Sequence, residues 1–238
     1  SPLGRKIKSF WLKHKLIGTP AMTFLHLSDI FYPSLFKIFS EKKRHEIADA
    51  HLAMGFIELY KYYGEKKYLI KSKQHIDYLI DNISTTEHGK GWGQPWEWVT
   101  PSGIVPSKNP VITNTAYCFD AIDKFSNIDN HKFYNQIMRD VSEFAKLELV
   151  GDKISDDQED AIYGYNFSAK AYNAIAYRAS LLLRSNDLFK NDTYKKAALK
   201  NLNYIIANQN DDGSWFYSQT SYYIDNIHTC FVLKNLIK

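Results

Sequence analysis

Three long polar segments hold the side chains best suited to chemistry, and the first of them, residues 91–98, places three tryptophans around one carboxylate. Tryptophan faces stack on the C–H surfaces of sugars and on other flat apolar groups. A carboxylate among such rings is desolvated, which favours its protonated form and general-acid use. We therefore expect Glu97 to act as a general acid and Trp92, Trp96 and Trp98 to contact a ligand. The alternative is a structural plug in which the three rings pack over the helices.

The last segment ends in Asp225 and His228, which lie three residues apart at a predicted helix start. Residues at this spacing project from one face, and a carboxylate beside an imidazole can share acid–base work. We interpret Asp225 as an ionised base or nucleophile, with His228 orienting Asp225 or the ligand. Proton abstraction would instead use His228 or a tyrosine, and the alternative is an Asp helix cap beside a His in a polar niche. Trp215 and Tyr217, earlier in the segment, are expected ligand contacts.

The middle segment begins with four carboxylates within residues 156–160 and continues into a helix entrance. Its glycine is displaced from the spacing of a calcium loop, so we expect a solvated acidic turn and no metal site. Tyr163, Tyr165 and Asn166 lie at the helix entrance and are candidate ligand contacts. Asn114, in the first turn of another predicted helix, is a further candidate, for which simple capping is the alternative.

The elements that must position these segments are helices of two alternating kinds. Apolar residues recur at steps of three and four, and no run alternates as a strand does. Inner helices are rich in small residues and tyrosine, outer helices are lysine-rich and amphipathic, and the pattern repeats about every 60 residues, as stacked helix pairs do. The expected inner helices are 48–62, 111–125, 167–183 and 224–236, and the expected outer helices are 67–83, 131–147 and 193–208.

The linkers between these helices are unequal. Inner-to-outer turns are short, whereas the outer-to-inner connections 84–110, 150–166 and 209–223 are long. Long structured loops in a compact domain are usually functional, and here they share one end with the N-termini of the inner helices. We predict one all-α domain over 1–238, an α/α toroid or partial (α/α) barrel. Residues 46–238 form its helix hairpins, and the basic helical segment 1–45 is a candidate to close the ring.

Composition narrows the function classes. The 238 residues are 45% hydrophobic and 15% aromatic with net charge +4, as in an ordinary globular protein. The basic start could touch a membrane or a partner protein, but no nucleic-acid-binding signature accompanies it. We expect no cofactor, because no phosphate loop or dinucleotide motif occurs. Cys118 and Cys230 are expected to be buried free thiols, which favours a cytoplasmic location. The opening residues, which lack a methionine, resemble the remnant of an expression tag, and this weakens the evidence for the location.

Two motifs add a resemblance. The stretch from Gln209 to Trp215, with Gly213 between, resembles the Gln–Trp repeat of α/α-toroid terpenoid cyclases, but the acidic motif that starts cyclase chemistry is absent. The segments 92–98, 212–217 and 224–229 resemble those of α/α-toroid proteins associated with bacterial surface-polysaccharide biosynthesis, related in fold to six-hairpin glycosidases. Residues 46–238 carry this resemblance, with Glu97 where that family commonly has Asp and Phe216 where it commonly has Tyr.

The resemblance implies a polysaccharide context more than a reaction. The leading hypothesis is a carbohydrate-active enzyme, a glycoside hydrolase, lyase or uronate epimerase, acting on a poly- or oligosaccharide. The alternative is a non-catalytic glycan-binding or scaffold protein of a polysaccharide assembly complex. Terpenoid or lipid binding is disfavoured because the loops are polar.

Overall fold

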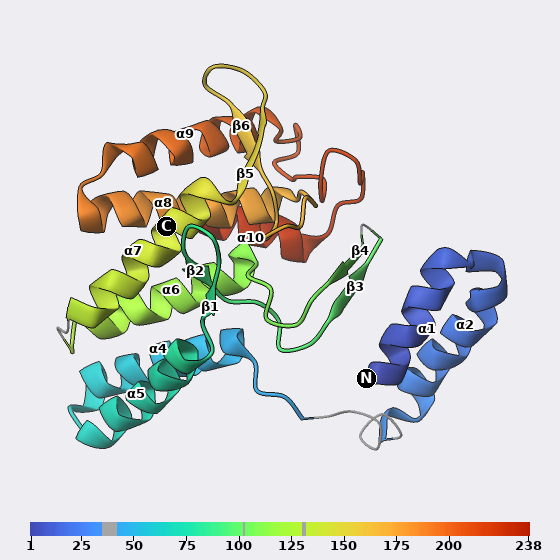
Figure 1. Cartoon of the computed structure of the whole chain (residues 1–238), viewed down its shortest axis with the longest axis horizontal. Coiled ribbons are helices and arrows are strands. Elements are labelled where there is room, and N and C mark those ends of the chain that lie inside the picture. The colour runs from blue at the N-terminus through green and yellow to red at the C-terminus, as the bar shows by residue number, and fades with distance from the viewer. Residues whose placement is uncertain (35–41, 102, 130–131) are drawn as a thin grey trace. The chain divides into compact units, whose positions relative to one another are not determined.

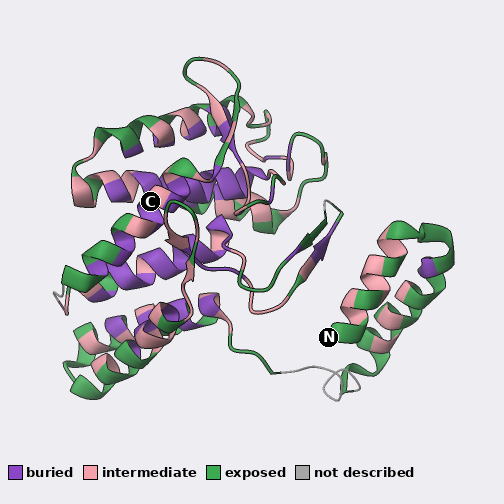
Figure 2. Ribbon diagram, viewed as in Figure 1, coloured by how far each residue is buried: buried purple, intermediate pink, exposed green. Residues whose placement is uncertain are grey.

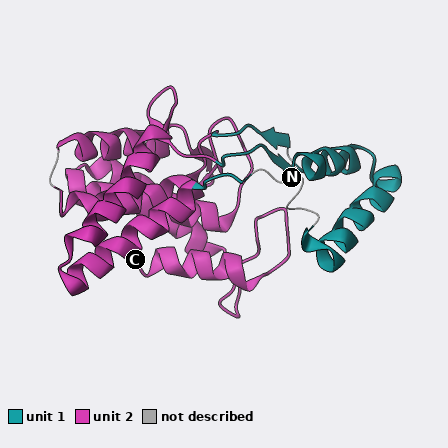
Figure 3. Cartoon of the chain, turned by 90° about the horizontal axis from the view of Figure 1, so that it is seen from below, with its two compact units in different colours: residues 1–45, 94–108 teal, residues 46–93, 109–238 magenta. Residues whose placement is uncertain are grey.

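A computed structural model describes residues 1–34, 42–101, 103–129 and 132–238, and these fall into two compact units. Unit 1 comprises residues 1–45 and 94–108, and unit 2 comprises residues 46–93 and 109–238 (Figure 3). Each unit is described by itself. Residues 35–41, within the expected N-terminal segment, and His131, the expected start of an outer helix, lie outside the described residues.

Unit 2 alternates inner and outer helices as predicted (Figure 1). Consecutive inner helices contact one another in the order α4, α6, α8 and α10, while α5, α7 and α9 each pack on the inner helix before them. The inner helices are α4 (Glu46–Tyr63), α6 (Ile112–Ser126), α8 (Tyr172–Phe189) and α10 (Asn226–Leu236). The outer helices are α5 (Lys66–Asp81), α7 (Lys132–Leu147) and α9 (Asp192–Ala207).

Burial explains why the two kinds of helix differ in composition. In α8 every residue from Tyr172 to Leu182 is buried, and α6 is nearly as enclosed, so small and aromatic residues suit both (Figure 2). In α7 the buried positions include Tyr134, Ile137 and Val141, at steps of three and four, while the other face carries lysine and arginine. The apolar pattern therefore specifies both the helices and their layer.

The long loops of unit 2 contain short antiparallel strand pairs. β1 (Ser84–Thr85) pairs with β2 (Lys90–Gly91), and β5 (Val150–Lys153) pairs with β6 (Glu159–Ala161). Each pair has two strands, in keeping with the expected near-absence of sheet. These pairs give the loops a backbone of their own.

One helix start was predicted wrongly: α8 begins at Tyr172, not at 167. The backbone N–H of Tyr163 donates to the carbonyl of Ala169 at 2.7 Å, and that of Tyr172 donates to the carbonyl of Tyr217 at 3.1 Å. These partners, one across a tight turn and one on the next loop, hold residues 163–171 in a non-helical path. A helical period in the sequence does not reveal such competing bonds.

The described part of unit 1 contains two helices and a hairpin. The expected helical segment 1–45 begins with α1 (Pro2–Lys13), which is followed by α2 (Lys15–Phe31), with His14 between them. β3 (Trp98–Thr100) pairs with β4 (Gly103–Val105), and α1 lies against β3. No helix among the described residues has the length and apolar character needed to cross a bilayer.

Both cysteines are free thiols, but their surroundings differ. Cys118 is buried in α6, whereas Cys230 is exposed on α10. The expectation of burial is therefore wrong for Cys230. Its helix, α10, is the last described helix of unit 2 and packs against α8.

Candidate functional site

The start of α10 holds an aspartate and a histidine in direct contact. Asp225 is the N-cap: its Oδ1 accepts from the backbone N–H of His228 at 2.7 Å, and its Oδ2 lies 2.6 Å from His228 Nδ1. These hydrogen bonds, the backbone one first, lower the pKa of Asp225. An ionised carboxylate only accepts, so Nδ1 carries the proton of this bond and Nε2 is left as the other reactive atom of the ring. Asp225 thus caps the helix and, with His228, also forms a pair that can transfer a proton.

Tyr217 joins this pair through its ring. Its centroid lies 4.7 Å from that of His228 in an edge-on arrangement, and the ring also stacks on Tyr223 at 5.1 Å. The backbone also fixes it, since Tyr217 donates to the carbonyl of Tyr223 at 2.9 Å. Burial, with smaller effects of Tyr163, Tyr223 and Asp225, raises the pKa of Tyr217 to about 12. The phenol is therefore a neutral hydrogen-bond donor at ordinary pH.

The second long loop brings Tyr163 to the same neighbourhood. Its hydroxyl lies 3.4 Å from Thr113 Oγ1 in the first turn of α6, and burial raises its pKa. Gly164 allows this approach, because a Cβ there would lie 2.7 Å from the carbonyl oxygen of Pro110. We call Tyr163, Tyr217, Asp225 and His228 the Asp–His cluster.

The other predicted residues of these loops have different surroundings. Tyr165 is half-buried and its backbone N–H donates to the carbonyl of Pro110 at 2.9 Å. Asn166 is exposed and takes a left-handed conformation, with φ of 49°, which asparagine tolerates. Asn114 is fully buried in the first turn of α6.

Below the cluster, an aromatic belt crosses the inner helices, and the sequence reasoning missed it. His51, Tyr117, Tyr177 and Phe231 are each the sixth residue of their inner helix. Successive ring centroids lie 4.8, 5.4 and 6.0 Å apart, and the hydroxyls of Tyr117 and Tyr177 are 2.7 Å apart. Phe231 follows His228 by three residues, so the belt lies one turn deeper. Aligning the inner helices at their starts is the signal that would have found it.

A cation on α10 reaches this belt. Lys234 Nζ lies 4.1 Å from the ring centroid of Tyr117 and 5.6 Å from that of Tyr177. Burial first, and then Lys234, lower the pKa of His51, while Asp120 opposes them. The floor beneath the Asp–His cluster is therefore aromatic and partly cationic.

Two of the predicted ligand-stacking residues are core residues instead. Trp92 and Trp215 are 0% and 2% exposed, and neither offers a face to a ligand in this structure. Their indole N–H groups donate to the carbonyls of Leu79 and Ile205, at 2.7 and 2.8 Å. Each carbonyl lies two residues before the end of an outer helix. Both tryptophans thus tie a helix end to the following loop, the structural role that the Gln–Trp resemblance implies.

At the equivalent place in α7, an arginine makes the bond. Arg178 Nε donates to the carbonyl of Ala145 at 2.7 Å, and Nη1 donates to Asn201 Oδ1 at 2.7 Å. Burial lowers the pKa of Arg178 to about 10, with Glu159 opposing. The guanidinium is still charged at neutral pH and serves the fold.

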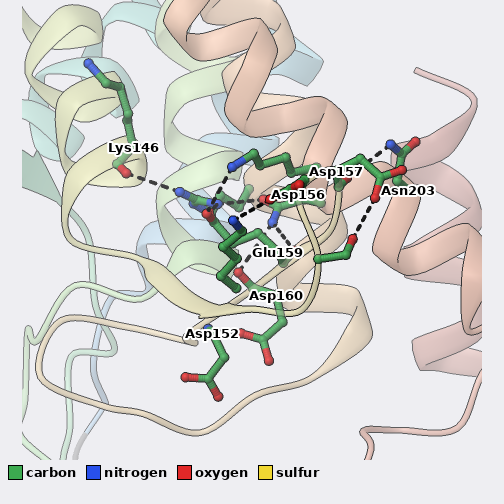
Figure 4. A network of polar contacts seen from close by, with 12 residues as sticks. Lys146, Asp152, Asp156, Asp157, Glu159, Asp160 and Asn203 are labelled. Carbon is green, nitrogen blue, oxygen red and sulfur yellow. Dashed lines mark hydrogen bonds and ion pairs between the residues drawn. The ribbon is translucent and has the colours of Figure 1, made fainter.

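The acidic turn of the second loop is occupied by internal partners (Figure 4). Asp160 Oδ2 accepts from Lys170 at 2.7 Å, and Asp156 Oδ1 accepts from Lys153 at 2.6 Å. The backbone carbonyl of Asp157 accepts from Asn203 at 3.1 Å. These carboxylates therefore hold the loop together, and the backbone carbonyl of Asp157 ties it to α9.

Glu97 lies in unit 1, where it lines a cavity of about 390 Å³. Trp96 and Trp98, both half-buried, line the same cavity together with Arg5 and Lys8. Glu97 itself is exposed. Glu97 therefore shares a cavity with two of the three tryptophans predicted around it. The same lining also holds cations, whereas the sequence predicted only aromatic rings that would desolvate the carboxylate.

Comparison with known proteins locates the fold. No family model and no curated protein matches the sequence. Among solved structures, a family 76 glycoside hydrolase from a bovine Bacteroides thetaiotaomicron strain has a TM-score of 0.54 at 14% identity, over 81% of this chain and 43% of that one. A family 88 glycosyl hydrolase from Bacteroides vulgatus has a TM-score of 0.54 at 14% identity, over 97% and 70%. A D-mannose isomerase has a TM-score of 0.51 at 14% identity, over 76% and 46%.

The fold is an α/α toroid, shared with these structures. The chain spans about half the length of the first and third of these structures and 70% of the second. In the described part of this toroid, the Asp–His cluster lies at the N-terminal ends of the inner helices. That is the end at which the long loops were predicted to meet.

Proposed function

We propose that this toroid acts on a poly- or oligosaccharide by general acid–base chemistry, with His228 as the group that moves the proton. The observation that carries the proposal is the 2.6 Å contact between Asp225 Oδ2 and His228 Nδ1. Neighbours of the same fold named as glycoside hydrolases and a sugar isomerase favour a sugar as the substrate. Hydrolysis, elimination and epimerisation are the three alternative reactions, and an experiment must distinguish between them.

The hydrogen bonds favour His228 over Asp225 as the reacting group. Both oxygens of Asp225 are engaged by His228, one with its backbone and one with its ring. Asp225 is then a positioning residue that fixes the tautomer, and Nε2 is free to accept a proton from a carbon beside a carbonyl or carboxyl group. Tyr217, neutral and edge-on to the ring, would donate to a substrate oxygen.

Hydrolysis of a glycosidic bond would require a different set of groups. Glycosidic cleavage typically uses two carboxyl groups roughly 5 to 9.5 Å apart. The predicted pair, Glu97 and Asp225, is divided between unit 1 and unit 2. In this branch Glu97 would be the acid and Asp225 the base or nucleophile, as the sequence suggests.

One assay separates these reactions. The full chain is incubated with neutral and uronate-containing oligosaccharides in D₂O and followed by proton NMR. New reducing ends report hydrolysis, vinyl protons report elimination, and deuterium at a ring carbon reports epimerisation. We expect His228→Gln to lower the rate by about 10²-fold or more with binding retained.

The matched control is His88→Gln, since His88 is exposed in the turn between β1 and β2, with its Nε2 3.8 Å from Glu87 Oε1. It should keep the wild-type rate. Wild-type turnover by His228→Gln would overturn the proposal. Binding without any turnover by the wild-type chain would favour the non-catalytic scaffold function instead.

A second proposal concerns α2, which we expect to rest on an anionic membrane surface. Leu16, Ile17 and Phe24 are 92%, 74% and 73% exposed, and Lys13 and Lys15 beside them are exposed cations. Apolar insertion beside basic residues is the pattern of a peripheral lipid-binding helix. Co-sedimentation with phosphatidylglycerol vesicles should exceed that with phosphatidylcholine vesicles and should fall in Phe24→Ser. Equal sedimentation with both kinds of vesicle would contradict the proposal. Stable binding to a second protein would favour the alternative that the basic N-terminal segment contacts a partner protein.

The setting in bacterial surface-polysaccharide biosynthesis and the cytoplasmic location stay predictions. The first comes from the motif resemblance, and the second from the reduced cysteines. Co-purification of the protein with a polysaccharide assembly complex from the cytoplasmic fraction would support both.

A further inference from the structure

The cavity of unit 1 is built from one face of a helix and the loop that faces it. Pro2, Arg5 and Lys8 lie at steps of three along α1, so they share a face, and all three line the cavity. Residues 96–99 line the other side. A volume of about 390 Å³ falls within the range of small-molecule sites.

Charge distinguishes this cavity. Among the described residues that line it, Arg5, Lys8 and Lys43 are cations and Glu97 is the one carboxylate, so this part of the lining carries a net positive charge. Arg5 and Lys8 are half-buried, whereas Lys6 on the same helix is exposed. Partly buried cations are screened less than exposed ones, and a guanidinium pairs with a carboxylate or phosphate through two parallel bonds. The lining therefore suits an anion.

The indoles of the cavity are held in place. Lys43 Nζ donates to the carbonyl of Pro95 at 3.2 Å, and His45 Nε2 lies 2.7 Å from Gln94 Oε1. The rings of His45 and Trp96 are 5.3 Å apart, and Trp98 is paired with Val105 in the β3–β4 ladder. Fixed aromatic faces are platforms on which a sugar ring can stack.

We propose that this cavity binds a saccharide unit that carries an anionic group, a carboxylate or a phosphate. Arg5 and Lys8 bind the anion, Trp96 and Trp98 stack on the ring, and Glu97 accepts hydrogen bonds from its hydroxyls. The inference rests on the proposed carbohydrate function for the choice of a sugar. Its test measures binding in unit 1 and does not depend on turnover at His228.

The experiment follows the indole N–H signals of Trp96 and Trp98 by ¹H–¹⁵N NMR of the full chain, assigned with Trp96→Phe and Trp98→Phe. The probes are glucuronate, glucose 6-phosphate, glucose and inorganic phosphate. Both indole signals should shift saturably with at least one anionic sugar, and glucose should need about tenfold more ligand, the value of one charge-assisted hydrogen bond. The tighter of the two anionic sugars identifies the anionic group.

Variants of equal charge change provide the control. Arg5→Gln and Lys8→Gln should each weaken binding of the anionic sugar about tenfold. Lys6→Gln and Lys13→Gln remove the same charge from exposed positions of α1 and should leave binding within about twofold, as expected for screened charges. Arg5→Lys, which keeps the charge, should retain part of the affinity, and circular dichroism checks that each variant folds.

Several results would overturn the proposal. Equal binding of glucose and both anionic sugars would show that the cavity does not recognise an anionic group. Equal losses of affinity in Lys6→Gln and Lys8→Gln would show that only the overall charge of the helix matters. If inorganic phosphate bound as tightly as glucose 6-phosphate, the sugar ring would contribute nothing to binding. Each of these outcomes leaves the acid–base proposal for His228 standing, whereas loss of turnover without loss of binding concerns that proposal alone.

Discussion

The first and third long loops each carry an anchored tryptophan followed by an open aromatic residue, and the two kinds of position differ sharply. Trp92 and Trp215 are buried and donate to the end of an outer helix. Trp98 and Tyr217, a few residues later, are half-buried and lie at the cavity of unit 1 and in the Asp–His cluster. One loop motif thus anchors a helix end with its first aromatic residue and places a later one in a candidate ligand site.

Removing an anchor is the largest effect that we predict. Trp215→Ala should lower the free energy of unfolding by about 3–5 kcal/mol, because it leaves a cavity and frees the carbonyl of Ile205. Urea denaturation followed by circular dichroism measures the change.

The matched substitution at an open position is Trp98→Ala. It should cost less than about 1.5 kcal/mol, since the half-buried ring loses less apolar contact. Equal losses at Trp98 and Trp215 would break the distinction between anchored and open positions.

Asp225→Asn tests the open position of the third loop without disturbing its cap. Asparagine caps helices as well as aspartate does, so stability should change by less than about 0.5 kcal/mol. The amide cannot hold the His228 tautomer in the same way, and we expect turnover to fall by about 10²-fold. A variant with full turnover, measured with the oligosaccharide that the wild type converts, would show that Asp225 is only a cap.

The smallest effect is the pH dependence of stability from Asp225. Its pKa is lower in the folded state, so it contributes stability above the unfolded value of about 3.9, and this contribution is lost as the pH falls through the folded pKa. The side chain is 34% exposed, so screening keeps the contribution below about 1 kcal/mol. The stability difference between wild type and Asp225→Asn should shrink as the pH falls below the unfolded value of about 3.9. A difference that is constant with pH would show that the hydrogen bonds do not favour the ionised form.

Sequence reasoning reached the architecture because the information is local. Helix periods and short turns fix the hairpins, and α4, α5, α6, α7, α9 and α10 begin within two residues of their predicted starts wherever the start is described. The start of α8 was missed because backbone partners on another loop, such as Tyr217, decide it.

The candidate site was reached only in part. The contact between Asp225 and His228 follows from their spacing, which is local. Whether an indole binds a ligand or a backbone carbonyl depends on which helix end lies beside it, so Trp92 and Trp98 look alike in the sequence. The belt from His51 to Phe231 was hidden because the loops between its members differ in length.

The central claim is that His228 is held as a base with a bare Nε2. The ¹⁵N spectrum of its imidazole, assigned by comparison with His228→Gln, reads this directly at neutral pH. For the neutral imidazole, the structure predicts the proton on Nδ1, and we expect the Nε2 signal to change when the converted oligosaccharide binds. An Nε2 that carries the proton and does not respond to that oligosaccharide would contradict the assignment of this cluster as the reacting site.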